Sequence, residues 1–185
     1  MKGSRATRNQ IKSQAITEAE KAEMMKKAED SMVSWTSKMM KQGLSPKDAM
    51  GLSSQMLEGI YAQAYRLYNT GKYLEASHLF RTLIVMDPTQ SKYLVGLAAC
   101  FHMLKEYKNA IYTYTMSSII DSDSPIPHYH SSDCFIQMKD YMSAVVSLKL
   151  AIKYAGERPE YGKLKERATM SLESIVKQLE ESPPG

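Results

Sequence analysis

Three histidines and one aspartate in the second half of this 185-residue chain are the side chains best suited to hold a metal ion. His128 and His130 are separated by one residue, and His102 and Asp133 are the other two candidates. Residues two apart on a helix face different sides, and the chain has no second histidine pair at helical spacing. We therefore expect no metal site and no cofactor.

Serine and cysteine side chains give an equally weak case for catalysis. Ser131, Ser132 and Asp133 lie near histidines, but no strand–turn–helix context surrounds them, as a hydrolase nucleophile would need, and no glycine-rich phosphate loop occurs. Cys100 and Cys134 are too few for a disulfide framework, and we expect both to be small buried apolar residues. The sequence predicts a protein that is not an enzyme.

These side chains belong to one pattern that recurs three times at a spacing of 34 residues. The repeated positions are Tyr73, Tyr107 and Tyr141; Ala76, Ala110 and Ala144; Phe80, Tyr114 and Leu148; Ala64, Ala98 and Ser132; and Leu67, Phe101 and Phe135. A period of 34 is that of the tetratricopeptide helix–turn–helix unit. Such units bury their apolar faces only by stacking, and the stack curves into a groove. The sequence predicts an all-α fold whose function is binding.

The repeat divides the chain into segments. We expect a disordered tail over 1–15, a helical extension over 16–56, repeats over 57–90, 91–124 and 125–158, a capping helix over 159–180 and a second tail over 181–185. Within the first repeat, turn signals predict helices over about 54–69 and 73–86. Pro46 predicts a short helix that ends near Gly51. Pro125 and Pro127 mark another helix start, with residues 121–124 as cap candidates, and Gly156 is a predicted C-cap.

The charge and apolar content exclude several classes of protein. The net charge of +4 comes from residues 1–56, where ten Lys/Arg face six Asp/Glu. The repeats are nearly neutral, so nucleic acid is not the predicted partner. No run of 18 apolar residues occurs, and no apolar stretch follows the basic start, so we expect neither a membrane span nor a secretory signal. Two cysteines fit a reducing cytoplasm.

The extension before the repeats has the composition of a helix with an apolar seam. Thr17 and Glu20 resemble a capping box, and the seam consists of Met25, Ala28, Met32, Trp35 and Met39. This face packs either on its own chain or across a homodimer through residues 16–56. A promiscuous docking surface and a membrane-surface helix are the alternatives, and we expect no stable membrane association.

The first helix of each repeat is expected to face the groove. Its predicted face consists of Glu58, Tyr61, Ala62, Tyr65, Tyr68 and Asn69; Lys92, Val95, Gly96, Ala99, His102 and Met103; and Ile126, Tyr129, His130, Asp133, Ile136 and Gln137. Rigid aromatics beside small residues suit an extended apolar peptide. A clamp for a C-terminal carboxylate would need more Lys, Arg and Asn. Gly96 and Ala99 are expected to leave pockets in the groove floor.

The repeats also resemble a known family, the class II chaperones of bacterial type III secretion. The resemblance covers residues 57–87, 93–121 and 124–152. It is carried by the Gly71-Lys72-Tyr73 turn, the Val95–Cys100 segment and the Pro127–His130 segment. The similarity implies a protein of the bacterial cytoplasm that holds hydrophobic translocator proteins before export.

That family binds an extended client segment with a Pro-x-Leu-x-x-Pro-like pattern, and its members often pair through N-terminal helices. The resemblance assigns peptide binding to Tyr61, Tyr65, Tyr68, Val95, Ala99, His102 and Tyr129. This chain differs from the family in its basic net charge and in its long extension. The alternative is a generic tetratricopeptide scaffold that assembles other proteins.

Overall fold

The computed structural model describes residues 45–181 and four isolated positions, 23, 26, 27 and 30. The chain divides into two compact units, Met1–Ser45 and Pro46–Gly185. In the first unit the four described residues are helical and exposed. The predicted capping box, the apolar seam and most of the proposed dimerisation segment 16–56 lie outside the described residues.

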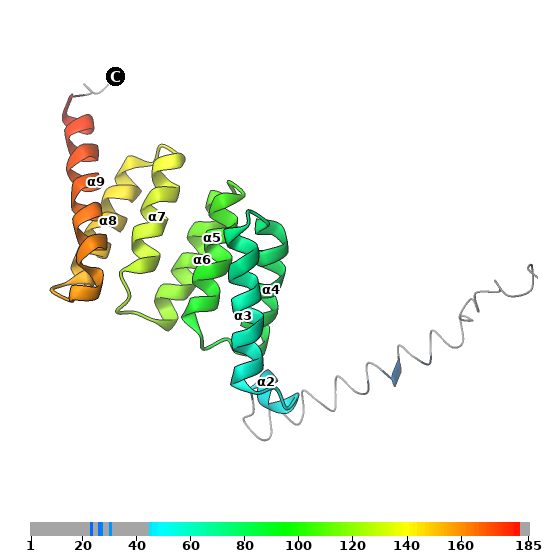
Figure 1. Cartoon of the computed structure of the whole chain (residues 1–185). Coiled ribbons are helices and arrows are strands. Elements are labelled where there is room, and N and C mark those ends of the chain that lie inside the picture. The colour runs from blue at the N-terminus through cyan, green and yellow to red at the C-terminus, as the bar shows by residue number, and fades with distance from the viewer. Residues whose placement is uncertain (1–22, 24–25, 28–29, 31–44, 182–185) are drawn as a thin grey trace, which may run out of the picture. The chain divides into compact units, whose positions relative to one another are not determined.

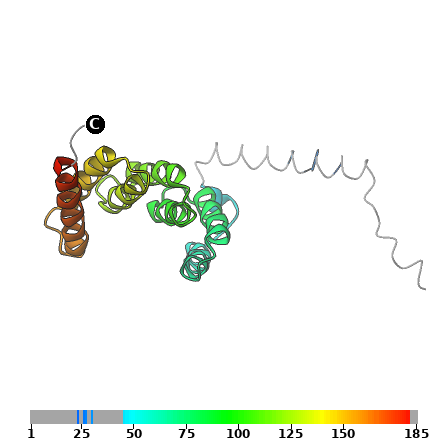
Figure 2. The same cartoon turned by 90° about the horizontal axis from the view of Figure 1, so that it is seen from above.

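The second unit is a stack of antiparallel helices (Figure 1). Its elements are α2 (Pro46–Ala49), α3 (Ser54–Asn69), α4 (Tyr73–Met86), α5 (Ser91–Met103), α6 (Tyr107–Ile120), α7 (Ile126–Gln137), α8 (Tyr141–Ala155), η1 (Pro159–Tyr161) and α9 (Gly162–Glu181). The pairs α3–α4, α5–α6 and α7–α8 are the three repeats, and Figure 2 shows them following one another in a row. The predicted all-α class is confirmed, and so are the bounds of α3 and α4.

Small residues at the repeated positions allow the helices within each repeat to approach closely. Their side chains are all fully buried: Ala64, Ala76, Ala98, Ala110, Ser132 and Ala144. The larger repeated residues Phe80, Tyr114 and Leu148 are buried beside them. Both cysteines are fully buried as predicted, and burial raises the pKa of Cys100 and of Cys134 to about 12.

The turn inside each repeat places one residue in the left-handed region. Gly71 has φ +79°, and the equivalent residues Lys105 and Lys139 have φ +62° and +60°. A glycine adopts this conformation freely, whereas a residue with a Cβ does so at a cost of about 1–2 kcal/mol. The second and third repeats therefore keep the turn geometry of the first without its glycine.

Three predicted helix ends differ in detail from the structure. Helix α7 has Pro125 at its N-cap and no side-chain cap bond, so residues 121–124 do not cap it. Proline supplies a preset φ and lacks an N–H, so this helix start leaves fewer donors to satisfy. The predicted capping helix begins as the 3₁₀ turn η1, and α9 follows from Gly162. The helix predicted to reach Gly51 ends at Ala49.

The C-cap prediction at Gly156 is confirmed. Gly156 has φ +55°, and its N–H donates to the carbonyl of Ile152. Beyond it, α9 buries Ala168 and Ile175 against α8 residues such as Leu148, which closes the end of the stack. None of the helices in the described part of the chain is long and apolar enough to cross a bilayer.

Candidate functional site

A hollow of about 470 Å³ opens between the first helices of the three repeats. Its lining comes mainly from α3, α5 and α7, the helices predicted to face the groove. The second helices contribute Phe80 and Tyr114, and η1 contributes Tyr161. The hollow is large enough to take several side chains of a peptide, in the size range of typical ligand sites.

Three tyrosines of α3 form one wall of the hollow. Tyr61, Tyr65 and Tyr68 follow at helical spacing, and neighbouring ring centroids are 6.3 and 6.5 Å apart. Tyr61 also meets the Phe80 ring edge-on, with centroids 6.0 Å apart. Tyr65 remains 53% exposed. Burial raises the pKa of Tyr61 and of Tyr68, so both of these phenols are uncharged at neutral pH.

The floor of the hollow is closed by a ring that lies over a glycine. A Cβ built on Gly96 would come within 2.3 Å of the Phe80 ring. The space left by the missing side chain is therefore filled by Phe80, and the predicted empty pocket at Gly96 is wrong. Val95 and Ala99 flank this contact and are half-buried, so they present a smooth apolar surface to the hollow.

Two imidazoles also line the hollow, His102 on α5 and His130 on α7. The His102 ring lies 5.8 Å from the Tyr107 ring, and His130 stacks on Tyr114 with centroids 5.7 Å apart. The Nδ1 atom of His130 lies 3.7 Å from a carboxylate oxygen of Asp133. Burial lowers the pKa of His102, so this ring is neutral at pH 7. His102 thus offers the hollow a hydrogen-bonding group without a buried charge.

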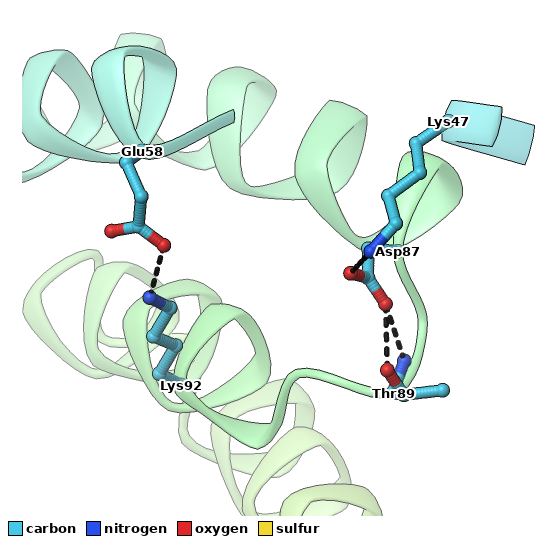
Figure 3. Close-up of polar contacts among 5 residues, drawn as sticks. All are labelled: Lys47, Glu58, Asp87, Thr89 and Lys92. Atoms are coloured by element: carbon cyan, nitrogen blue, oxygen red, sulfur yellow. Dashed lines mark hydrogen bonds and ion pairs between the residues drawn. The ribbon is translucent and has the colours of Figure 1, made fainter. Parts of the chain in front are cut away.

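One ion pair spans the rim between the first two repeats. The Nζ atom of Lys92 on α5 lies 2.5 Å from Oε1 of Glu58 on α3 (Figure 3). The same ammonium lies over the Tyr61 ring at 4.8 Å and over the Tyr93 ring at 5.5 Å. The hydrogen bond to Glu58 raises the pKa of Lys92. The charge of Lys92 is therefore compensated by Glu58, and its ammonium is held against the Tyr61 ring of the tyrosine wall.

The comparisons with known proteins decide the family. The tetratricopeptide repeat family matches residues 57–89 and 91–123. Low calcium response locus protein H of Yersinia pseudotuberculosis is 33% identical over 124 residues, which are 67% of this chain and 74% of the relative. The type III secretion chaperone SycD of Yersinia enterocolitica, solved with a peptide of the translocator YopD, is 32% identical. The match has a TM-score of 0.66 and covers 70% of this chain and 98% of SycD.

The chain belongs to the chaperones of type III secretion. A second solved member, PcrH of Pseudomonas aeruginosa in complex with the chaperone binding region of PopD, is 30% identical with a TM-score of 0.67. That match covers 69% of this chain and 96% of PcrH. The resemblance read from the repeat residues is thereby confirmed.

The structure brings six of the seven predicted binding residues of this chaperone to the hollow. They are Tyr61, Tyr65, Tyr68, Val95, Ala99 and His102. Tyr129 does not line the hollow, because it packs against the cluster formed by α8 and α9. Its neighbour His130 lines the hollow instead, and the two rings lie 5.3 Å apart.

The lining also includes residues that the repeat pattern does not single out for binding. Phe80 and Tyr114 occupy repeated positions of the pattern, and each is buried and still reaches the hollow. Asp121 and Ser124 come from the α6–α7 connection, and Tyr161 comes from η1. The equivalence of Asp121 to Asp87 at a spacing of 34 was a usable signal, but nothing in the sequence pointed to Tyr161.

The first connection between repeats is fastened by a buried carboxylate. The Nζ atom of Lys47 on α2 lies 2.6 Å from Oδ2 of Asp87, and Thr89 donates its hydroxyl to Oδ1 at 2.6 Å (Figure 3). The hydrogen bond from Lys47 lowers the pKa of Asp87. Across the described residues, no group of three or more His, Cys, Asp or Glu side chains is arranged to hold a metal ion.

Proposed function

We propose that this chain is a cytoplasmic chaperone of type III secretion that holds an extended segment of a hydrophobic translocator in the hollow, and so keeps the client soluble and unassembled before export. The observation that carries the proposal is the aromatic, largely uncharged hollow between the first helices of the repeats. Relatives of this family have been solved with translocator segments.

The chemistry of the hollow supports an apolar and extended client. The tyrosine wall offers broad, rigid rings that lose little conformational entropy on binding. Burial keeps the phenols of Tyr61 and Tyr68 and the imidazole of His102 neutral, so an apolar segment meets no fixed charge there. A segment that contains proline is already restricted in the free client and loses less entropy when it binds.

A translocator needs such a partner because of its own surface. Apolar segments destined for a membrane associate with one another in water, and exposed apolar patches of this kind drive aggregation. Occupation of one segment by the hollow removes it from that association. Tyr61, Tyr65, Tyr68, Val95, Ala99 and His102 contact the client in this proposal, and Tyr129 acts indirectly by supporting the neighbouring ring of His130.

Co-expression with a translocator from the same genome tests the function. The full chain should move the translocator from the insoluble to the soluble fraction and co-purify with it. Tyr65→Glu should abolish that effect, because it places a charge on the exposed tyrosine wall. Tyr112→Glu is the matched control, since Tyr112 is 66% exposed on α6 and does not line the hollow.

Two results would contradict the proposal. The translocator stays insoluble with the full chain, or Tyr65→Glu and Tyr112→Glu solubilise it equally well. Binding confined to partners that are already folded would instead identify a scaffold. A far-UV circular dichroism melt of both variants checks that the helices are intact.

A further inference from the structure

Two aspartates occupy the same place in successive repeats. Asp87 is the C-cap of α4 and Asp121 is the C-cap of α6, 34 residues later. Their backbones match, with φ −142° and ψ 87° at Asp87 and φ −123° and ψ 83° at Asp121. The N–H of each donates to the carbonyl four residues earlier. The two carboxylates therefore leave the backbone from the same conformation at two equivalent corners of the stack.

The first of these corners is occupied by a cation. The ammonium of Lys47 lies 2.6 Å from the Asp87 carboxylate, and Asp87 is only 4% exposed. Lys47 comes from α2, which lies outside the repeats. The repeat geometry at this position is thus able to receive a basic side chain supplied from another segment.

The second corner is open and lines the hollow. Asp121 is exposed and borders the hollow beside Ser124 and Ile126. No cation of the described residues makes an ion pair with its carboxylate. The carbonyl end of α6 adds a partial negative charge at the same point. This corner therefore has the charge that attracts a cation, at the edge of the proposed client site.

The basic side chains of the adjoining segments are already engaged. Lys92 is held by Glu58 at 2.5 Å and lies over two tyrosine rings. Arg158 donates to the backbone carbonyls of Asp123 and Tyr154, and its guanidinium lies over the Tyr161 ring at 4.6 Å. Both cations are therefore held by acceptors other than the Asp121 carboxylate.

We propose that Asp121 is a specificity residue that pairs with a lysine or arginine of the bound client segment, as Asp87 pairs with Lys47. This inference rests on the proposed function, and it adds one basic residue to the apolar pattern of the client. The bound segment covers part of the hollow, so the pair is less hydrated than a surface ion pair. We expect it to strengthen binding about threefold to tenfold.

Synthetic peptides test the pairing directly with the full chain. The probe is a panel of short fluorescent peptides that share a Pro-x-Leu-x-x-Pro core, with one lysine at a different position in each, and a matched glutamine peptide for every lysine peptide. Fluorescence anisotropy gives the affinities. At one position, or two adjacent ones, the lysine peptide should bind about threefold to tenfold more tightly than its glutamine partner. Asp121→Asn should remove this difference, so that the lysine and glutamine peptides bind with equal affinity.

Asp123→Asn is the matched control, because Asp123 is exposed in the same connection and does not line the hollow. It should keep the lysine preference. Asp121→Lys should reverse the preference, so that a glutamate at the same position binds better than lysine. Peptides that bind the wild type with no lysine preference, or a preference that persists in Asp121→Asn, would overturn the pairing alone. If none of the peptides binds and the translocator also stays insoluble on co-expression, the proposed function fails as well.

Discussion

The two junctions between repeats are built from equivalent residues, yet they are closed in different ways. At the first junction the Phe80 ring covers Gly96, and at the second the equivalent Tyr114 ring stacks on the equivalent His130. The first junction is also fastened at its rim, where Lys92 pairs with Glu58. One repeat later, Lys92 occupies the position equivalent to Glu58, and Ile126 occupies the position equivalent to Lys92. The ion pair therefore has no counterpart at the second junction.

The aspartates at the two junctions differ in the same way: the one at the first junction has a partner within the chain, and the one at the second is open. Asp87 is buried under Lys47 at the first, whereas Asp121 is open to the hollow at the second. The first junction therefore satisfies its polar groups internally and acts as a fixed support. The second leaves an imidazole and a carboxylate facing the hollow, so this junction offers a client both hydrogen bonds and charge.

The sharpest way to break the first junction is to add a side chain at Gly96. Gly96→Val must displace the Phe80 ring, because even a Cβ would come within 2.3 Å of it. We expect a loss of about 1–3 kcal/mol in the free energy of unfolding, as for other overpacked sites. Urea denaturation measures it. Gly59→Ala is the control: nothing lies within 4 Å of its Cβ, and it should stabilise α3 by up to about 1 kcal/mol.

The tyrosine wall and the third repeat should separate binding from stability. Tyr65→Ala removes an exposed ring of the hollow and should weaken peptide binding about tenfold with little change in melting temperature. Tyr129→Ala opens a gap beside the α8–α9 cluster and should cost about 1–3 kcal/mol of stability with a smaller effect on affinity. Anisotropy titrations and thermal melts of both variants check this. Equal effects of both variants on binding would contradict the distinction.

The aspartates at the two corners should differ in their effect on acid stability. The pKa of Asp87 is lowered by Lys47, so its ion pair stabilises the fold above the unfolded pKa of about 3.9 and this contribution is lost as pH falls through the folded value. Asp87→Asn should therefore lower the urea midpoint at pH 7 and converge on the wild type at low pH. Asp121→Asn should change the midpoint little at either pH.

The imidazoles of the second junction should make client binding sensitive to acid. Burial lowers the pKa of His102, so the ring is neutral at pH 7 and becomes charged only as pH falls below its ordinary range. Protonation there, beside His130 and Asp133, would place charge against an apolar client. We expect an affinity loss of about two- to fivefold once the pH has fallen far enough below the ordinary histidine value to protonate this ring. His102→Gln should flatten this profile, and an unchanged profile would assign the effect to another group.

The repeats could be predicted from the sequence because the residues at which the helices pack recur every 34 residues. Ala64, Ala98 and Ser132 must be small wherever two helices touch, so the period was visible in residue types alone. Six of the seven residues predicted to bind a client line the hollow, and they share the same register. Tyr129 shares the register of Tyr61 and Val95, but α9 packs against its cluster, and the contact of a helix outside the repeat is not encoded in the repeat pattern.

Other features of the structure could not be predicted from the sequence, because they depend on contacts between residues that are not equivalent in the 34-residue repeat. The approach of Phe80 to Gly96 fills what looked like a vacant floor position, because the ring reaches across from the preceding helix. Tyr161 reaches the hollow from η1, and Lys47 reaches Asp87 from α2. These contacts form where segments outside the repeats pack onto the stack. Such packing cannot be predicted from the residue type at any one position.

The left-handed lysines at the repeat turns lower the stability of their own hairpins. Lys105 and Lys139 hold a conformation that costs each about 1–2 kcal/mol, whereas Gly71 holds it freely. Each of these two turns therefore subtracts about 1–2 kcal/mol from the stability of its hairpin, a cost that the glycine turn of the first hairpin does not carry.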